Sequence, residues 1–219
     1  VLHQDVKQVF VVVRLKSHRK GAGMFELDHI AVVCADLDRG AAWLSEVLGV
    51  PLLAGGQHPR FGTHNRLLGL ADGLYLEVIA PDPIAQVDGP RWFDLDNAPQ
   101  VPRWGNWICR ADDLETDIAG PAIAMSRGDL HWQITVPTDG SLPMQGGYPT
   151  LINWDDMAAH PAMKLPDSGC RLLKWEVHHP EAQMLTKCCK IRGSMVNFLP
   201  ADRVRFVASF QTPNGEVTI

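Results

Sequence analysis

The stretch that decides the fold runs from Phe25 to Pro81 and begins and ends with an apolar strand. The first strand reads FELDHIAVV (residues 25–33), and the last reads LYLEVIA (residues 74–80). Because successive side chains of a strand point to opposite faces, two sets are each expected to share a face: Phe25, Leu27, His29, Ala31 and Val33 in the first strand, and Tyr75, Glu77 and Ile79 in the last. Burying a lone imidazole or carboxylate is costly without a partner. A divalent metal, a substrate or a mutual hydrogen bond is therefore expected to join His29 and Glu77.

The residues between these strands predict one helix and two more strands. Asp36 provides a helix N-cap, apolar residues then recur at helical spacing, and Gly49 ends the segment. Short strands are predicted over 51–54 and 63–70, with a tight turn at 71–73 before the last strand. Residues 24–82 therefore form a predicted βαβββ module.

The same layout restarts after a linker over residues 83–102 that is rich in proline and aspartate. Aligning residues 113–115 with residues 36–38 places Asn106 at the position of His29, and Asn153 in the closing strand then matches Glu77. A short helix is predicted after Asp113, followed by strands over 129–136 and 149–155. Residues 103–165 are interpreted as a second βαβββ module.

The remainder of the chain predicts a third, partial βαββ module over residues 166–219, with a helix over 180–190 and a final hairpin around residues 213–215. Residues 1–23 are interpreted as an N-terminal extension before Met24 or as an added edge strand. Repeated modules bury their sheet faces against one another. The predicted fold class is α+β, with paired βαβββ modules forming a cupped, partly closed β-barrel and a third partial module.

Composition is that of an ordinary globular chain, with 219 residues, 46% of them hydrophobic and 21% charged. A formal charge of −5 argues against nucleic acid as the main partner. No apolar run approaches the roughly 20 residues that a membrane-spanning helix needs, so no membrane partner is expected. The five cysteines are odd in number and lack metal-knuckle spacing, which favours reduced thiols and a cytoplasmic location.

Several motifs in this layout resemble the glyoxalase-like branch of the vicinal oxygen chelate superfamily, which includes glyoxalase I, extradiol dioxygenases, methylmalonyl-CoA epimerase and antibiotic-resistance proteins. The matching segments are residues 27–30 (LDHI), 36–38 (DLD), 62–65 (GTHN), 74–77 (LYLE) and 79–81 (IAP). The resemblance covers about residues 24–219 and is weaker from Arg171 onward.

The resemblance implies a divalent metal (Zn, Mn, Fe, Ni or Mg) on the concave face of the sheet. His29 and Glu77 match the first half of the usual ligand set, whereas Asn106 and Asn153 occupy the second half. Asparagine is a poor ligand for transition metals and suits harder cations better. His131, on the polar face of its strand, is a further candidate ligand.

Other side chains are candidates for contact with a substrate. His64 and Asn65 begin a strand after a loop, and the family resemblance favours His64 as a proton carrier, although a turn stabilised by its own side chains is the alternative. Arg127 is either a clamp for a carboxylate or phosphate or a surface arginine. Trp154 is expected at the pocket, with Trp132 in the pocket or in the core.

Two functions follow from these expectations. The first is a metal-dependent lyase, isomerase or dioxygenase that acts on a small oxygen-rich molecule, with His29 and Glu77 as metal ligands, Glu77 and His64 as catalytic residues, and a set of substrate contacts: Asn65, Asn106, Arg127, His131, Asn153 and Trp154. The second is a binding protein that sequesters or senses a small molecule without chemistry. The superfamily also implies a homodimer as a candidate assembly.

Overall fold

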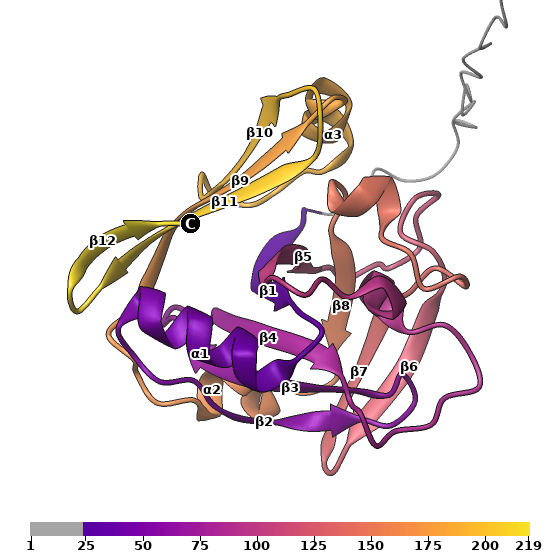
Figure 1. Ribbon diagram of the computed structural model, residues 1–219. Coiled ribbons are helices and arrows are strands. Elements are labelled where there is room, and N and C mark those ends of the chain that lie inside the picture. The colour runs from indigo at the N-terminus through magenta and orange to yellow at the C-terminus, as the bar shows by residue number, and fades with distance from the viewer. Residues whose placement is uncertain (1–23) are drawn as a thin grey trace, which may run out of the picture.

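The computed structural model describes residues 24–219, and the predicted N-terminal extension lies outside these residues. Two sheets and a few short helices make up the described chain (Figure 1). The strands of the larger sheet are β1 (Glu26–Val33), β2 (Leu53–His58), β3 (Thr63–Gly69), β4 (Tyr75–Pro81), β5 (Arg103–Arg110), β6 (Ala122–Arg127), β7 (Leu130–Thr135) and β8 (Thr150–Trp154). The smaller sheet contains β9 (Arg171–His179), β10 (Val196–Pro200), β11 (Arg205–Thr212) and β12 (Gly215–Thr218).

The larger sheet is built from two halves that meet in its middle. Its strand order is β2-β3-β4-β1-β5-β8-β7-β6, with β1 antiparallel to β5, β1 parallel to β4 and β5 parallel to β8. The two halves therefore have equivalent pairing about the β1–β5 junction, and the sheet curls into a half-barrel. This confirms the predicted α+β class and its paired modules.

Helix α1 (Leu37–Leu48) is the one long helix of the first half, and it forms as predicted. The carboxylate of Asp36 accepts a hydrogen bond from the backbone N–H of Arg39, and Gly49 ends the helix at φ 72°. Leu44 and Leu48 are fully buried against the outer face of the sheet. The capping residues and the apolar stripe thus place α1 outside the half-barrel.

A β-bulge in β1 corrects the predicted faces of the first strand. Leu27 pairs with Cys109 and His29 with Ile108, so Asp28 is an extra residue. Phe25 and Leu27 accordingly lie in the outer core, whereas Ala31 and Val33 lie in the inner core. The five residues expected on one face are therefore divided between two, because the bulge interrupts the alternation.

The second half departs from its predicted elements in two ways. No helix follows Asp113; there the side chains of Asp113 and Thr116 bond to nearby backbone N–H groups, which favours a turn. Strand β6 was not predicted, and it pairs with β7 so that Arg127 opposes Leu130 at the hairpin end.

The predicted linker is partly structural. A 3-10 helix, η1 (Trp92–Asn97), buries Trp92, Phe93 and Leu95 in the inner core. The linker therefore supplies part of the wall inside the half-barrel, rather than only wrapping the surface.

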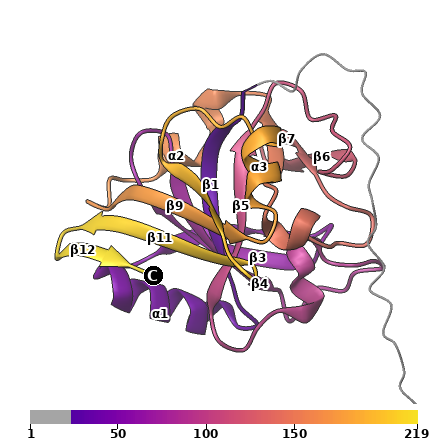
Figure 2. The same cartoon turned by 90° about the horizontal axis from the view of Figure 1, so that it is seen from above.

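The smaller sheet covers the outer face of the larger one. Strands β9 and β11 pass across β1 and β5 (Figure 2), and Trp175 of β9 packs edge-on against Trp104 of β5. Helix α3 (Ala182–Cys188) joins β9 to β10. Because β9 lies between β10 and β11, the strand order β10-β9-β11-β12 differs from that of the first half, so this segment does not repeat its pairing.

The described residues include no helix long and apolar enough to cross a membrane. Two remaining 3-10 helices, η2 (Pro143–Gly146) and η3 (Met157–Ala159), and helix α2 (Pro161–Lys164) flank β8. All five cysteines are free thiols.

Candidate functional site

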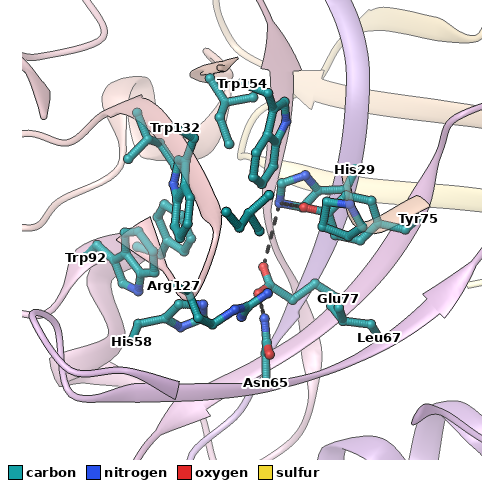
Figure 3. A pocket seen from close by; sticks show the side chains of 15 residues that line it. His29, His58, Asn65, Leu67, Tyr75, Glu77, Trp92, Arg127, Trp132 and Trp154 are labelled. Atoms are coloured by element: carbon teal, nitrogen blue, oxygen red, sulfur yellow. Dashed lines mark hydrogen bonds and ion pairs between the residues drawn. The ribbon is translucent and has the colours of Figure 1, made fainter. Parts of the chain in front are cut away.

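A small cavity of about 40 Å³ lies inside the half-barrel (Figure 3). Its polar lining consists of His29, His58, Asn65, Glu77 and Arg127, and its aromatic lining consists of Tyr75, Trp92, Phe93, Trp132 and Trp154. A buried water needs roughly 10–15 Å³ on this measure. The cavity therefore suits a ligand of only a few heavy atoms, held by charge and hydrogen bonds between aromatic walls.

The bulge brings Asp28 and His29, which are adjacent in sequence, to the same region of the site. His29 Nδ1–H donates to Asp28 Oδ1 at 2.5 Å. This bond fixes the tautomer of His29 and leaves Nε2 as the nitrogen that faces the cavity. An imidazole held in this way by a carboxylate is arranged for proton transfer.

Asp28 is fully buried and accepts four hydrogen bonds. His160 Nε2, Arg110 Nη1 and Trp154 Nε1 donate to Oδ2 at 3.0, 3.1 and 3.1 Å, in addition to the bond from His29 to Oδ1. His160 Nδ1 accepts from the backbone N–H of Ala162, so the Nε2–H tautomer of His160 faces Asp28.

Burial by itself raises the pKa of Asp28, but hydrogen bonds from His160 and His29 and the electrostatic interaction with both imidazoles lower it more, so its net pKa lies well below the usual range. Asp28 is therefore a permanent anion at neutral pH.

Glu77 faces His29 across the cavity. Asn65 Nδ2 donates to Glu77 Oε1 at 2.5 Å, and Glu77 Oε2 lies 3.7 Å from His29 Nε2. Burial raises the pKa of Tyr75 well above its usual value, so its hydroxyl stays protonated and donates to His29 Nε2 at 3.4 Å. His29 Nε2 and Glu77 Oε2 thus form a pair that could carry a proton.

Arg127 brings a positive charge into the same cavity. Its side chain extends beside Glu77 and His58 (Figure 3) and passes over Gly56, where a Cβ would lie 2.5 Å from Nη1. Within residues 24–219, no carboxylate or carbonyl accepts a hydrogen bond from this guanidinium. A guanidinium left unpaired in a cavity favours an anionic ligand with paired oxygens.

The structure brings five of the predicted site residues to the cavity: His29, Asn65, Glu77, Arg127 and Trp154. It places the four others elsewhere. His64 lies on the opposite face of β3 from Asn65, beside Arg66, which pairs with Asp38 of α1, and His131 is exposed on β7.

The two asparagines have local partners. Asn106 is fully buried and donates to Thr150 Oγ1, whereas Asn153 Nδ2 donates to the carbonyl of Ala111. None of these four residues lines the cavity.

The strand register corrects the predicted match between the two halves. His29 lies beside Ile108 in the β1–β5 pair, and Ile108 is in the inner core. Glu77 pairs with Ala31, two residues after His29. In the same way, Ile152 pairs with Arg110, two residues after Ile108. The equivalents of His29 and Glu77 are therefore Ile108 and Ile152, not Asn106 and Asn153.

This donor set does not fit a resident divalent metal with ligands from both halves. His29 and Glu77 supply two donors, isoleucines hold the equivalent positions, and a guanidinium enters the same space. Within the described chain, no three His, Cys, Asp or Glu side chains converge as a metal site would require.

Sequence reasoning missed four residues of the site: Asp28, His58, Trp92 and His160. Strict strand alternation places Asp28 on the opposite face from His29, and only the bulge brings it to the site. His160 precedes Pro161 in what resembles a simple turn. No local signal marks His58, because its β2 segment contains two glycines and resembles a loop. Proximity in the fold, rather than a motif, reveals these residues.

A second, larger hollow of about 660 Å³ opens beside β5 and β11. Arg103 and Arg205 lie at its exposed rim, and Trp104 and Phe206 form part of its wall. Among residues 24–219, no histidine lines it, and the one carboxylate side chain in its lining, Asp94, is exposed and already accepts a hydrogen bond from Asn97. The smaller cavity is therefore the better candidate for chemistry.

The half-barrel, its paired halves and the His–Glu cavity define a protein of the vicinal oxygen chelate class. Residues 27–190 match the family model described as "Glyoxalase-like domain", and the chain belongs to this family. No curated protein matches the chain in sequence.

The chain is similar to several solved structures at low sequence identity. A hypothetical protein from Staphylococcus aureus is 14% identical with a TM-score of 0.58, over 84% of this chain and 88% of that chain. The Mn(II)-bound glyoxalase from Novosphingobium aromaticivorans is 11% identical over 90% of this chain and 82% of its own, with a TM-score of 0.45. Methylmalonyl-CoA epimerase from Mycobacterium tuberculosis is 19% identical over 58% and 85%, with a TM-score of 0.39.

Proposed function

We propose that the protein is a lyase or isomerase that moves a proton on a small, anionic, oxygen-rich molecule such as a 2-oxo or 2-hydroxy acid. The observation that carries this proposal is one cavity that holds both a His–Glu pair, 3.7 Å apart, and the guanidinium of Arg127, which has no hydrogen-bond acceptor among residues 24–219. The first supplies a route for a proton, and the second supplies charge for an anion.

In this mechanism, Arg127 binds the carboxylate of the ligand and orients the carbon with the acidic C–H, C3 of a 2-oxo acid or C2 of a 2-hydroxy acid, toward the His29–Glu77 pair. One member of the pair removes the proton from that carbon, and the pair then returns the same proton to the ligand. Negative charge develops on the ligand oxygen as the C–H bond breaks. Arg127 stabilises this charge because a fixed cation acts strongly where water is largely excluded.

Asp28 supports the proton transfer without touching the ligand. Its carboxylate holds the Nδ1–H of His29, so that a proton on Nε2 is balanced by a buried negative charge. The aromatic walls exclude water from the pair. Asp28 is therefore a positioning residue, whereas His29 and Glu77 act on the reacting atoms.

A resident divalent metal is not part of this proposal, because the chain supplies only half of its ligands. Protein purified without chelator is expected to hold far less than one equivalent of Zn, Mn, Fe, Ni or Mg, measured by inductively coupled plasma mass spectrometry. A His29→Ala, Glu77→Gln double variant is expected to hold the same amount. Stoichiometric metal in the wild type that is lost in the double variant would contradict this account and restore the metal-dependent hypothesis.

Replacing Arg127 is expected to weaken binding of oxalate, a planar dianion that resembles the enolate of a 2-oxo acid. Loss of a charged hydrogen-bonding group costs about 1.5–3 kcal/mol, so the Kd of Arg127→Met is expected to rise roughly 10- to 100-fold by calorimetric titration. Arg39→Met removes the same charge from the exposed face of α1 and serves as the control. Equal affinities for the two variants would show that Arg127 does not hold the anion.

A second candidate function is a binding protein without chemistry. The observation that favours it is the pair Ile108 and Ile152, because one half of the site carries apolar side chains where the other carries His29 and Glu77. In that case the cavity would hold an anion, but no proton would move.

One experiment separates the two candidates. Small 2-oxo and 2-hydroxy acids are incubated with the protein in D₂O, and loss of the C3–H signal of a 2-oxo acid or the C2–H signal of a 2-hydroxy acid is followed by ¹H NMR. A proton-transfer enzyme is expected to accelerate exchange for at least one acid beyond the buffer rate. Binding of these acids with no exchange above buffer would leave the non-catalytic function.

A further inference from the structure

His58 lines the cavity next to Arg127 and takes no part in the mechanism above (Figure 3). It is buried, with 6% of its surface exposed, and lies at the end of β2. Burial, together with the positive charge of Arg127, lowers its pKa to about 3. The imidazole is therefore neutral at physiological pH, and one ring nitrogen carries a hydrogen while the other accepts.

The hydrogen-bond partners of Thr63 decide which ring nitrogen of His58 carries the hydrogen. Trp92 Nε1–H, which can only donate, donates to Thr63 Oγ1 at 3.0 Å, and His58 Nδ1 lies 3.0 Å from the same oxygen. Thr63 is fully buried, and no other acceptor for its hydroxyl hydrogen is found among residues 24–219. A buried hydroxyl without an acceptor is costly, so Thr63 O–H donates to His58 Nδ1.

The hydrogen of His58 is then on Nε2. No atom of residues 24–219 bonds to Nε2, and the imidazole ring faces the cavity beside the guanidinium of Arg127. We propose that the Trp92–Thr63 pair fixes the imidazole of His58 as a neutral donor whose Nε2–H binds an oxygen of the ligand. This inference rests on the proposed function, because it requires a ligand with a carbonyl or carboxylate oxygen in the cavity.

A neutral donor has a specific use at this position. It stabilises charge that develops on an oxygen without giving up a proton, so it does not compete with the His29–Glu77 pair. His58 and Arg127 together make a two-donor site, which favours carbonyl and carboxylate oxygens, because these only accept, over a hydroxyl group, whose hydrogen needs an acceptor of its own. His58 is thus a catalytic residue by contact with the ligand, and Thr63 is a positioning residue.

The tautomer is measured directly with histidine labelled in both ring nitrogens. A two-bond ¹H–¹⁵N correlation spectrum distinguishes the Nε2–H tautomer from the Nδ1–H tautomer, and the His58 signals are assigned from their loss in His58→Gln. The wild type and Thr63→Ser, which keeps the hydroxyl, are expected to show Nε2–H. Thr63→Val removes the hydroxyl donor and is expected to change the tautomer pattern of His58 in this spectrum. An Nδ1–H tautomer in the wild type would overturn the inference.

Contact with a ligand is tested with oxalate on the same proteins. Saturating oxalate is expected to shift the Nε2–H signal of His58, and Thr63→Val is expected to bind oxalate about tenfold more weakly than Thr63→Ser, as for one neutral hydrogen bond. An unchanged His58 signal with oxalate bound would overturn the contact. If oxalate does not bind, the ligand contact fails together with the proposed function, whereas the tautomer still decides the role of Thr63 by itself.

Discussion

His29→Gln is expected to lower the rate of deuterium incorporation at least 100-fold in the acid that the wild type exchanges. General acid–base groups typically contribute 10²–10⁴-fold, and glutamine cannot take up or release a proton at neutral pH. Its amide can still bond to Asp28, so the change removes the proton carrier while leaving the buried carboxylate a partner. The measurement is the first-order loss of the exchanging C–H signal in D₂O.

A matched histidine variant controls for general effects on the protein. His178 lies on β9 in the smaller sheet, where it contacts Glu176 and Arg205, and His178→Gln is expected to exchange at the wild-type rate. Equal melting temperatures for His29→Gln and wild type would confirm that the fold is intact. If folded His29→Gln retained more than a third of the wild-type rate, His29 would not be the proton carrier.

Asp28→Asn is expected to lower the free energy of unfolding by about 3–5 kcal/mol at pH 7, the usual cost of breaking a buried charged network. Three donors converge on Oδ2 alone, from His160, Arg110 and Trp154. An amide can accept at one atom only, so its NH₂ group must face either these three donors or the Nδ1–H of His29. The measurement is urea unfolding followed by tryptophan fluorescence.

The pH dependence of this effect has a defined sign. The pKa of Asp28 is lowered in the folded protein, so its contribution to stability is fully present above the unfolded pKa near 4 and is lost as pH falls below that value. The difference between wild type and Asp28→Asn is therefore expected to shrink below about pH 4. Asp38→Asn, which affects an exposed pair with Arg66, is expected to change stability by less than about 1 kcal/mol at any pH. A difference for Asp28→Asn that grew in acid would contradict the assignment of a buried anion.

Much of the fold could be predicted because its signals are local. The cap at Asp36, the glycine at position 49 and the alternating strands of the first half each specify an element without reference to the remainder of the chain. The second half was less predictable, since the segment after Asp113 resembles a helix start in sequence but has side chains that stabilise a turn. The register between the two halves depended on a bulge and could not be obtained by aligning spacings.

The site was predicted only in part for the same physical reason. His29 and Glu77 stand out as polar residues in apolar strands, and both line the cavity. Asp28 is as polar as His29, but strict alternation assigns it to the opposite face. His160 and Trp92 come from segments remote in sequence, and only packing brings them to Asp28 and Thr63. These contacts arise from the tertiary structure, so no pattern along the chain marks them.

The central claim is that Arg127, rather than a bound metal, holds an anionic ligand against the His29–Glu77 pair. The most direct test is a calorimetric titration of oxalate into wild-type protein treated with EDTA and then freed of chelator, repeated with added Mn²⁺. We predict one oxalate per chain without metal, with an affinity that Mn²⁺ does not increase. Oxalate binding that appears only after Mn²⁺ is added would contradict the account.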